Sequence, residues 1–145
     1  MTTFVFPGQG SQFIGMSRDF YDNFNISKEI FKLVSDITKI DIKDIIFKDP
    51  SNLLDQTQYT QLAIFCASTS IYQALINEVD MEKLNVKFML GHSLGEYTAL
   101  AAAKILSIED CSLLLKTRGE LMQNAFEPNL SAMAAIIGLN CDNVA

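Results

Sequence analysis

The chain has 145 residues, of which 49% are hydrophobic, and it carries a formal net charge of −6 at pH 7. That length suits one domain with a core of its own. The negative charge argues against broad electrostatic binding to nucleic acid, so any anionic ligand must be held by particular residues. The sequence offers two arginines for that task, Arg18 and Arg118.

Cysteine and histidine are too few and too scattered for a metal site. The three cysteines stand at positions 66, 111 and 141, and the chain has a single histidine. This pattern excludes the usual zinc spacings and is typical of a reducing compartment. The N-terminus lacks the features of a signal peptide, and residues 62–76 form too short and too polar a stretch to span a bilayer. We therefore expect a soluble, cytoplasmic protein without metal, cofactor, nucleic acid or membrane.

The first predicted elements are a short strand and two helices. Residues 3–6 form a β-type run that ends at a Pro-Gly-Gln-Gly turn over residues 7–10, where the backbone can approach a ligand closely. The same turn also fits a plain strand-to-helix connection. Residues 11–24 are ambiguous and partly helical. Amphipathic spacing predicts a helix over residues 27–39, and a shorter one follows over residues 41–47.

A long helix is predicted over residues 57–77. Gln61 lies near the middle of its apolar arc, at the N-terminal end. A buried amide must be paired, so Gln61 either bonds to backbone or lines a cavity.

Residues 86–96 form the stretch with the most specific chemistry. Five mostly apolar residues predict a strand, and Gly91-His92-Ser93-Leu94-Gly95 then leads directly into a helix-forming segment. Glycine on either side of the serine lacks the Cβ that would clash in so sharp a turn. The helix N-terminus points at the serine, where backbone N–H groups stabilise a developing oxyanion. This context is typical of a nucleophile elbow with Ser93 as the nucleophile.

A simpler interpretation of the same residues stays open. Ser93 and Glu96 fit the S-x-x-E pattern of a capping box, in which the serine merely starts a helix. An ordinary cap has no use for Gly91 and Gly95, however, and this favours the nucleophile.

A second capping box, beginning at Ser107, opens a helix to about residue 126. Arg118 falls in the centre of its apolar stripe, where a charge needs a partner. One account is a structural ion pair or a guanidinium that extends to the surface. The functional account is a two-pronged clamp on a substrate carboxylate.

Residues 132–138 predict a third strand, and the order of elements predicts a parallel α/β sheet with helices on its faces. A serine nucleophile also needs a general base. His92 is poorly placed for this, because neighbouring side chains on an extended strand diverge. Either the chain is a fragment of a longer enzyme, or it is not a serine enzyme. The unfinished third strand favours the fragment.

Four motifs then carry a family resemblance. They are residues 6–12 (FPGQGSQ), residues 60–61 (TQ), residues 91–97 (GHSLGEY), and Arg118-Gly119 with Met122-Gln123. In these motifs, and in their order along the whole chain, the sequence closely resembles the malonyl-CoA:acyl-carrier-protein transacylases, the acyltransferases of fatty acid synthesis.

The resemblance implies a fold and a reaction. It implies an α/β-hydrolase-like acyltransferase core over residues 1–126, truncated here, and the first strand of a small ferredoxin-like subdomain within residues 127–145. Ser93 would be acylated by malonyl-CoA and would pass malonyl to the phosphopantetheine thiol of acyl carrier protein, in ping-pong chemistry.

The resemblance also implies the site. The backbone N–H groups of Gln9 and Leu94 would form the oxyanion hole. Arg118 would hold the malonyl carboxylate and so select malonyl over acetyl, which would leave a buried charge unpaired. Gln61 and Met122 would lie in the pocket wall. His92 is not assigned by the resemblance: from its place before Ser93, we interpret it as a residue that packs or, at most, orients or lines the pocket.

Parts of the family's pattern are absent from this chain. The family's general-base histidine and the rest of the small subdomain lie in a later segment, and Leu62 stands where the family usually has proline. We therefore expect the chain alone to be nearly inactive. An esterase or thioesterase of the α/β-hydrolase type, and a non-catalytic remnant that binds acyl-CoA or carrier protein, remain alternatives. Malonyl and methylmalonyl are not distinguished.

Overall fold

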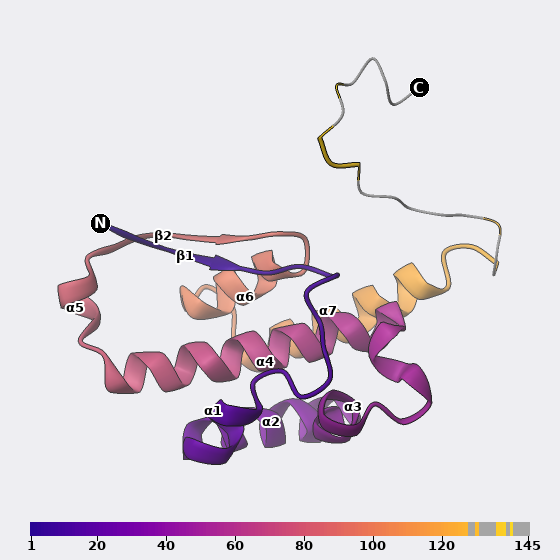
Figure 1. The fold of residues 1–145 in the computed structure, drawn as a ribbon, viewed down its shortest axis with the longest axis horizontal. Coiled ribbons are helices and arrows are strands. Elements are labelled where there is room, and N and C mark those ends of the chain that lie inside the picture. Colours follow the sequence, from indigo (N-terminus) through magenta and orange to yellow (C-terminus); the bar gives the residue numbers. More distant parts are fainter. Residues whose placement is uncertain (128–129, 131–135, 139, 141–145) are drawn as a thin grey trace.

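The computed structural model describes residues 1–127, 130, 136–138 and 140, and in these residues a two-stranded parallel sheet lies above a layer of helices (Figure 1). In chain order the elements are β1 (Thr2–Phe6), α1 (Arg18–Asn23), α2 (Asn25–Thr38), α3 (Ile42–Lys48), the 3-10 helix η1 (Pro50–Asp55), α4 (Thr57–Glu78), α5 (Met81–Leu84), β2 (Val86–Gly91), α6 (Gly95–Ala102) and α7 (Ile108–Gln123).

The two strands are far apart in sequence but adjacent in space. They pair in parallel with Phe6 opposite Gly91, so their carboxyl ends meet at one edge of the sheet. A parallel pair needs a long crossover, which the helices between β1 and β2 supply. Tyr72 of α4 packs edge-on against Phe4 and Phe6, and this contact joins the sheet to the helical layer. The predicted parallel α/β arrangement is confirmed.

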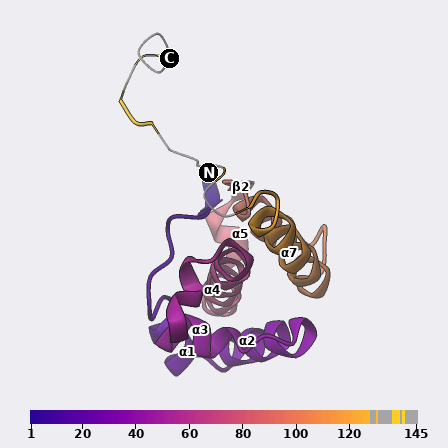
Figure 2. The same cartoon turned by 90° about the vertical axis from the view of Figure 1, so that its right-hand side faces the viewer.

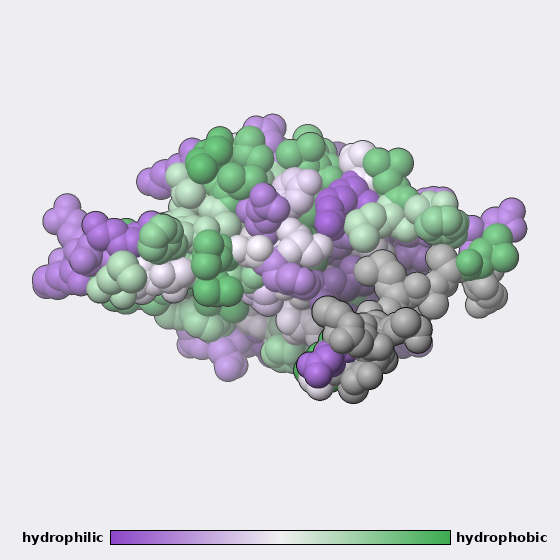
Figure 3. Space-filling model, turned by 90° about the horizontal axis from the view of Figure 1, so that it is seen from above, coloured by the Kyte–Doolittle hydropathy of each residue, from purple (hydrophilic) through white to green (hydrophobic). Residues whose placement is uncertain are grey.

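The other face of the sheet is uncovered within the described residues. Val5, Phe88 and Leu90 alternate with the inward-facing side chains and are 69%, 56% and 53% exposed. Seen from above, hydrophobic residues form patches on the face that carries the strands (Figure 3). The sequence predicted helices on both faces of the sheet, whereas in the described chain they cover one.

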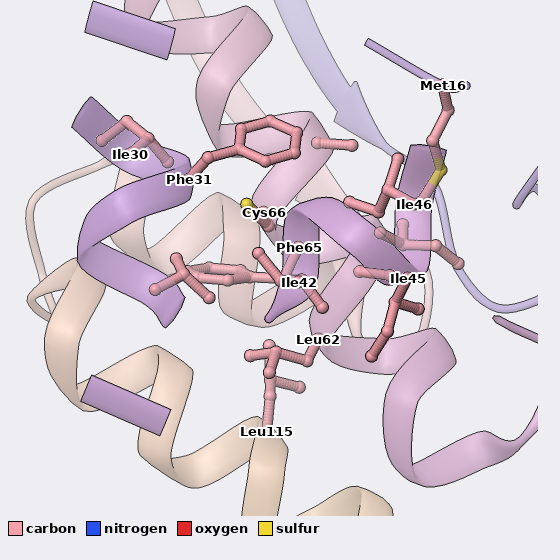
Figure 4. Packing of buried hydrophobic residues seen from close by; sticks show 14 of the residues in the cluster. Met16, Ile30, Phe31, Ile42, Ile45, Ile46, Leu62, Phe65, Cys66 and Leu115 are labelled. Carbon is pink, nitrogen blue, oxygen red and sulfur yellow. The ribbon is translucent and has the colours of Figure 1, made fainter. Parts of the chain in front are cut away.

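Helix α4 is the axis of the helical layer. Figure 2 looks along it, with α7 on one side and α2 and α3 below. Residues 61–67 are all buried, as expected for a helix surrounded by other elements. Side chains from α2, α3, η1, α4, α6 and α7 meet in one core, and Figure 4 shows several of them, among them Phe31, Ile46, Leu62, Phe65 and Leu115. The position of α7 relative to α4 is therefore set by tight packing.

Most predicted elements are confirmed to within a few residues. The helix expected to reach about residue 126 ends at Gln123, and the ambiguous stretch over residues 11–24 contains the short α1. The strand predicted over residues 132–138 lies outside the described residues except for residues 136–138, which are not in a strand. Among the described helices, none is both long enough and apolar enough to cross a bilayer.

Candidate active site

Ser93 lies at the apex of a tight turn between β2 and α6. The strand ends at Gly91 and the helix begins at Gly95. Ser93 is exposed and has φ of +54°, in the left-handed region that residues with a Cβ rarely adopt. The turn is held by backbone hydrogen bonds from Gly95 N to His92 O at 2.9 Å and from Glu96 N to Ser93 O at 3.1 Å. Such strain is typical of functional positions.

The two flanking glycines allow this turn because the backbone passes too closely for side chains. A Cβ on Gly91 would overlap the carbonyl of Gly95. A Cβ on Gly95 would overlap the carbonyl oxygen of Phe6 and lie 2.7 Å from that of Pro7. The end of β1 therefore presses against the start of α6, and this contact places the Pro-Gly-Gln-Gly turn beside the serine.

The capping-box interpretation of Ser93 is wrong. The N-cap residue of α6 is Leu94, and no side chain caps that helix. The second predicted box is confirmed in part, because the Ser107 hydroxyl accepts the N–H of Asp110 at the start of α7. The difference is that Ser107 has the extended backbone of a cap, whereas Ser93 has a left-handed one.

Arg118 of α7 reaches the serine. Its Nη2 donates to Ser93 Oγ at 3.0 Å, and its Nη1 donates to Gln61 Oε1. The guanidinium lies 5.9 Å from the centroid of the Tyr97 ring, within range of a weak cation–π contact. Its sequence position in the middle of an apolar stripe is thus explained by polar partners at the rim of the core, and no carboxylate of the described residues pairs with it.

Gln61 is fully buried and uses both ends of its amide. Its oxygen accepts from Arg118, and its Nε2 lies 3.2 Å from Met122 Sδ. The sequence predicted a bond to backbone or a cavity lining, and the structure corrects this to two side-chain partners on α7. The Gln61 amide holds the guanidinium in this direction. If Arg118 turned away, the buried Gln61 oxygen would lose its hydrogen bond, and the folded protein would be destabilised.

The Pro-Gly-Gln-Gly turn lies next to the elbow. Gln9 is tied to the start of α4 through a hydrogen bond from its Nε2 to Thr57 Oγ1 at 3.2 Å. Neither the N–H of Gln9 nor that of Leu94 donates a backbone hydrogen bond within the part of the chain that the structure describes. Both donors are therefore available to a ligand.

His92 faces the turn. Its backbone N–H donates to Phe6 O at 3.1 Å, and its ring lies so close to Gly8 that a Cβ there would overlap Nδ1. In the described chain, no hydrogen bond joins the imidazole to Ser93, whose side-chain partner is Arg118. The ring thus lies against the Pro-Gly-Gln-Gly turn that follows β1, and not against the serine hydroxyl, as the divergence of neighbouring side chains predicts.

Taken together, a strained serine and a guanidinium held by a buried amide meet at the carboxyl ends of two parallel strands, beside the turn that carries Gln9, and α/β proteins bind ligands at such an edge. The model of the acyl transferase domain matches residues 3–141. This chain belongs to the acyl transferase domain family. The matched segment contains both the elbow around Ser93 and the buried-stripe arginine, Arg118.

Individual proteins similar to this chain have names that belong to the same family. A protein of Staphylococcus aureus named malonyl CoA-acyl carrier protein transacylase is 40% identical over 143 residues, covering 99% of this chain and 44% of its own length. The solved structure of an acyl-carrier-protein S-malonyltransferase from Bartonella henselae matches with a TM-score of 0.81 and 40% identity, over 88% of this chain and 41% of that one. A malonyl CoA-acyl carrier protein transacylase from Clostridium perfringens matches with a TM-score of 0.77 and 42% identity, over 88% and 39%. The chain thus spans less than half the length of these family members.

Sequence reasoning missed two residues of this site. Tyr97 closes the motif over residues 91–97 but was given no role, because helix periodicity does not relate it to Ser93, which lies outside α6. Gly119 was noticed as part of a motif, but its packing against α4 was not. A glycine in the middle of a helix that is otherwise free of them was the available signal.

Proposed function

We propose that this chain carries the nucleophile and the carboxylate clamp of a malonyl transferase that moves malonyl from malonyl-CoA to the phosphopantetheine thiol of acyl carrier protein. The observation that supports this most is the hydrogen bond between Arg118 and the strained Ser93. It brings a fixed positive charge to the nucleophile, and a malonyl group carries a negative charge two bonds from its reacting carbonyl.

The first half-reaction forms a seryl ester. Ser93 Oγ attacks the thioester carbonyl, the C–S bond breaks, and CoA leaves as its thiol with the proton that the serine gave up. The N–H groups of Gln9 and Leu94 would stabilise the oxyanion of the tetrahedral intermediate. In the second half-reaction the carrier thiol attacks the ester and restores the serine hydroxyl.

The clamp would act by exchange of partners. In the free protein, Arg118 Nη2 is bonded to the serine hydroxyl. An arriving malonyl carboxylate binds the guanidinium more strongly than a neutral hydroxyl does, and so releases the hydroxyl for attack. Gln61 and Met122 would hold the guanidinium from behind, while His92 would line the pocket. Acetyl offers no charge, so the half-buried guanidinium would stay without a charged partner.

The general base is the part of the mechanism that these residues do not supply. His92 is the single histidine, and its ring lies against Gly8. We therefore expect slow acylation by the 145-residue chain alone. Residues 1–126 would form the main domain and residues 127–145 would begin the small subdomain, which agrees with α7 ending at Gln123. The free, buried thiols of Cys66 and Cys111 fit a cytoplasmic location.

The arginine separates this function from the esterase alternative. An esterase with water as acceptor gains nothing from a cation bonded to its nucleophile. Arg118 has no carboxylate partner among the described residues, and it is held in place by a buried amide. This arrangement favours an anionic acyl group.

The test is a hybrid enzyme. Residues 1–145 are joined to the part of the Staphylococcus aureus relative that follows its matched segment, and malonyl transfer to acyl carrier protein is measured. The hybrid should transfer malonyl much faster than acetyl, and its Ser93→Ala variant should transfer neither. A hybrid that folds but hydrolyses simple esters and leaves the carrier unmodified would support the esterase instead. One that binds malonyl-CoA without any turnover would support the non-catalytic alternative.

A further inference from the structure

Gly119, the neighbour of Arg118, lies where α7 crosses the first turn of α4. It is buried, and a Cβ added to it would lie 2.8 Å from Gln58 Cα, 3.0 Å from Gln58 O and 3.2 Å from Thr57 O. Distances below 3.0 Å are essentially never seen for real Cβ atoms. All three neighbours are backbone atoms, so none of them can swing aside as a side chain would. The two helices touch backbone to backbone at this point.

The contacts that hold the guanidinium from the side of α4 lie within one helical turn of this crossing. On α4, Gln61 follows Gln58 by three residues and so stands on the same side of the helix. On α7, Met122 stands three residues after Gly119. The hydrogen bond that Gln61 accepts from Arg118 and the one that it donates to Met122 Sδ therefore bridge the two helices beside their closest approach.

The distance between the helices decides how far Arg118 can reach. Helices normally pack with their axes 8–10 Å apart, as side chains dictate. Glycine removes the side chain at the crossing and permits a closer approach. Glycine is also a poor helix former, so its place in the middle of α7 needs a packing reason. The close crossing provides one.

We propose that Gly119 is a positioning residue that sets the α4–α7 distance at which Gln61 holds Arg118 against Ser93, and that it thereby sets the preference for an acyl group with a carboxylate. The inference rests on the proposed function for the identity of that acyl group. The mechanism is steric. A methyl group at position 119 must move the helices apart by about 0.6 Å to regain an ordinary 3.4 Å contact, and a shift of that size disturbs a site that depends on orientation.

The test compares two thioesters on the chain and on its Gly119→Ala variant. The dissociation constants of malonyl-CoA and acetyl-CoA are measured by calorimetry, and helix content is followed by circular dichroism. We expect Gly119→Ala to weaken malonyl-CoA binding at least about tenfold and to leave acetyl-CoA binding within about twofold, with the helices retained. Glu120→Ala is the matched control, because this exposed neighbour on α7 should change neither constant.

The outcomes separate this inference from the proposed function. If the unchanged chain shows no preference for malonyl-CoA, the proposed function is wrong. If it shows the preference and Gly119→Ala keeps it, or weakens both ligands equally, then Gly119 is structural and the inference is wrong. Should the single variant fail to fold, Gln58→Gly/Gly119→Ala gives the second measurement, because glycine at position 58 lets the first turn of α4 yield to the added methyl. The helices then keep their spacing, so the double variant should recover the preference for malonyl-CoA, and a folded double variant without it would overturn the inference.

Discussion

Arg118 Nη2 lies 3.0 Å from Ser93 Oγ, although 25 positions separate the two residues in the chain. Neither element brings this about alone. The elbow projects the serine from the end of β2, and α7 carries the arginine along the side of α4. Gln61, buried in α4, holds the guanidinium in the direction of the serine. The candidate site is therefore assembled on α4 as much as on the elbow.

The two arginines of the chain provide a matched pair of substitutions. Arg118→Ala should lower malonyl-CoA affinity at least about tenfold, or about 1.4 kcal/mol, because the carboxylate loses its charged partner. Arg18→Ala should have no effect, since Arg18 donates to Phe47 O at 3.2 Å and stacks on the Phe47 ring elsewhere on the surface. Calorimetric titration with malonyl-CoA checks both variants. If the two substitutions changed the affinity for malonyl-CoA equally, Arg118 would not be the residue that binds the malonyl carboxylate.

A second matched pair of substitutions compares a glycine of the elbow, Gly95, with a glycine outside it, Gly10. Gly95→Ala should lower the free energy of unfolding by about 3 kcal/mol, because the new methyl meets the backbone carbonyls of Phe6 and Pro7. Gly10→Ala has no atom within 4 Å of the added Cβ and should lose only about 1 kcal/mol, through its φ of +104°. Urea unfolding followed by circular dichroism measures both. Similar losses for the two variants would mean that the elbow is not as tightly packed as described.

The left-handed backbone at Ser93 predicts that glycine is tolerated there better than alanine. Glycine adopts a φ of +54° without steric penalty, whereas serine and alanine do not. Ser93→Gly should therefore be more stable than Ser93→Ala by about 1 kcal/mol in urea unfolding. Both variants lose the hydrogen bond to Arg118, so that loss cancels in the comparison. If the alanine variant were the more stable of the two, the left-handed conformation would be refuted.

Stability should fall at alkaline pH through a buried thiol. Burial, with a smaller contribution from the charge of Asp110, raises the pKa of Cys111 from 9.0 to about 11. The unfolded chain therefore releases this proton at lower pH than the folded chain, and the free energy of unfolding decreases as pH rises from about 9 to 11. Urea unfolding at intervals across that range should show a shallower decline for Cys111→Ala. A slope unchanged by the substitution would contradict the assignment.

The sequence predicted most of the fold because its elements are marked locally. The amphipathic spacing that indicated α2 is produced by buried residues such as Ile30, Phe31 and Val34, which face one core. The strand, the paired glycines and the following helix of the elbow are likewise contiguous. The 3-10 helix η1 was missed because it is built on left-handed backbone at Ser51 and Asn52, which has no strong sequence signal.

The geometry of the site could not be predicted in the same way. Periodicity placed Gln61 and Arg118 on the buried sides of their own helices, but it says nothing of how two helices cross. The contact between them depends on the backbone approach at Gly119, which is a property of tertiary packing. The roles given to Gln9, Leu94 and Met122 came from the family resemblance, and that of His92 came from its place beside Ser93; all four stay proposals.

The most direct test of the account is acylation of Ser93 itself. The 145-residue chain is incubated with malonyl-CoA and with imidazole, which serves as the missing base, and its peptides are analysed by mass spectrometry. The account predicts a malonyl ester on Ser93 that is absent from Ser93→Ala and is formed far more slowly by acetyl-CoA. Malonyl found on another residue, or an ester at Ser93 formed equally fast from both thioesters, would contradict it.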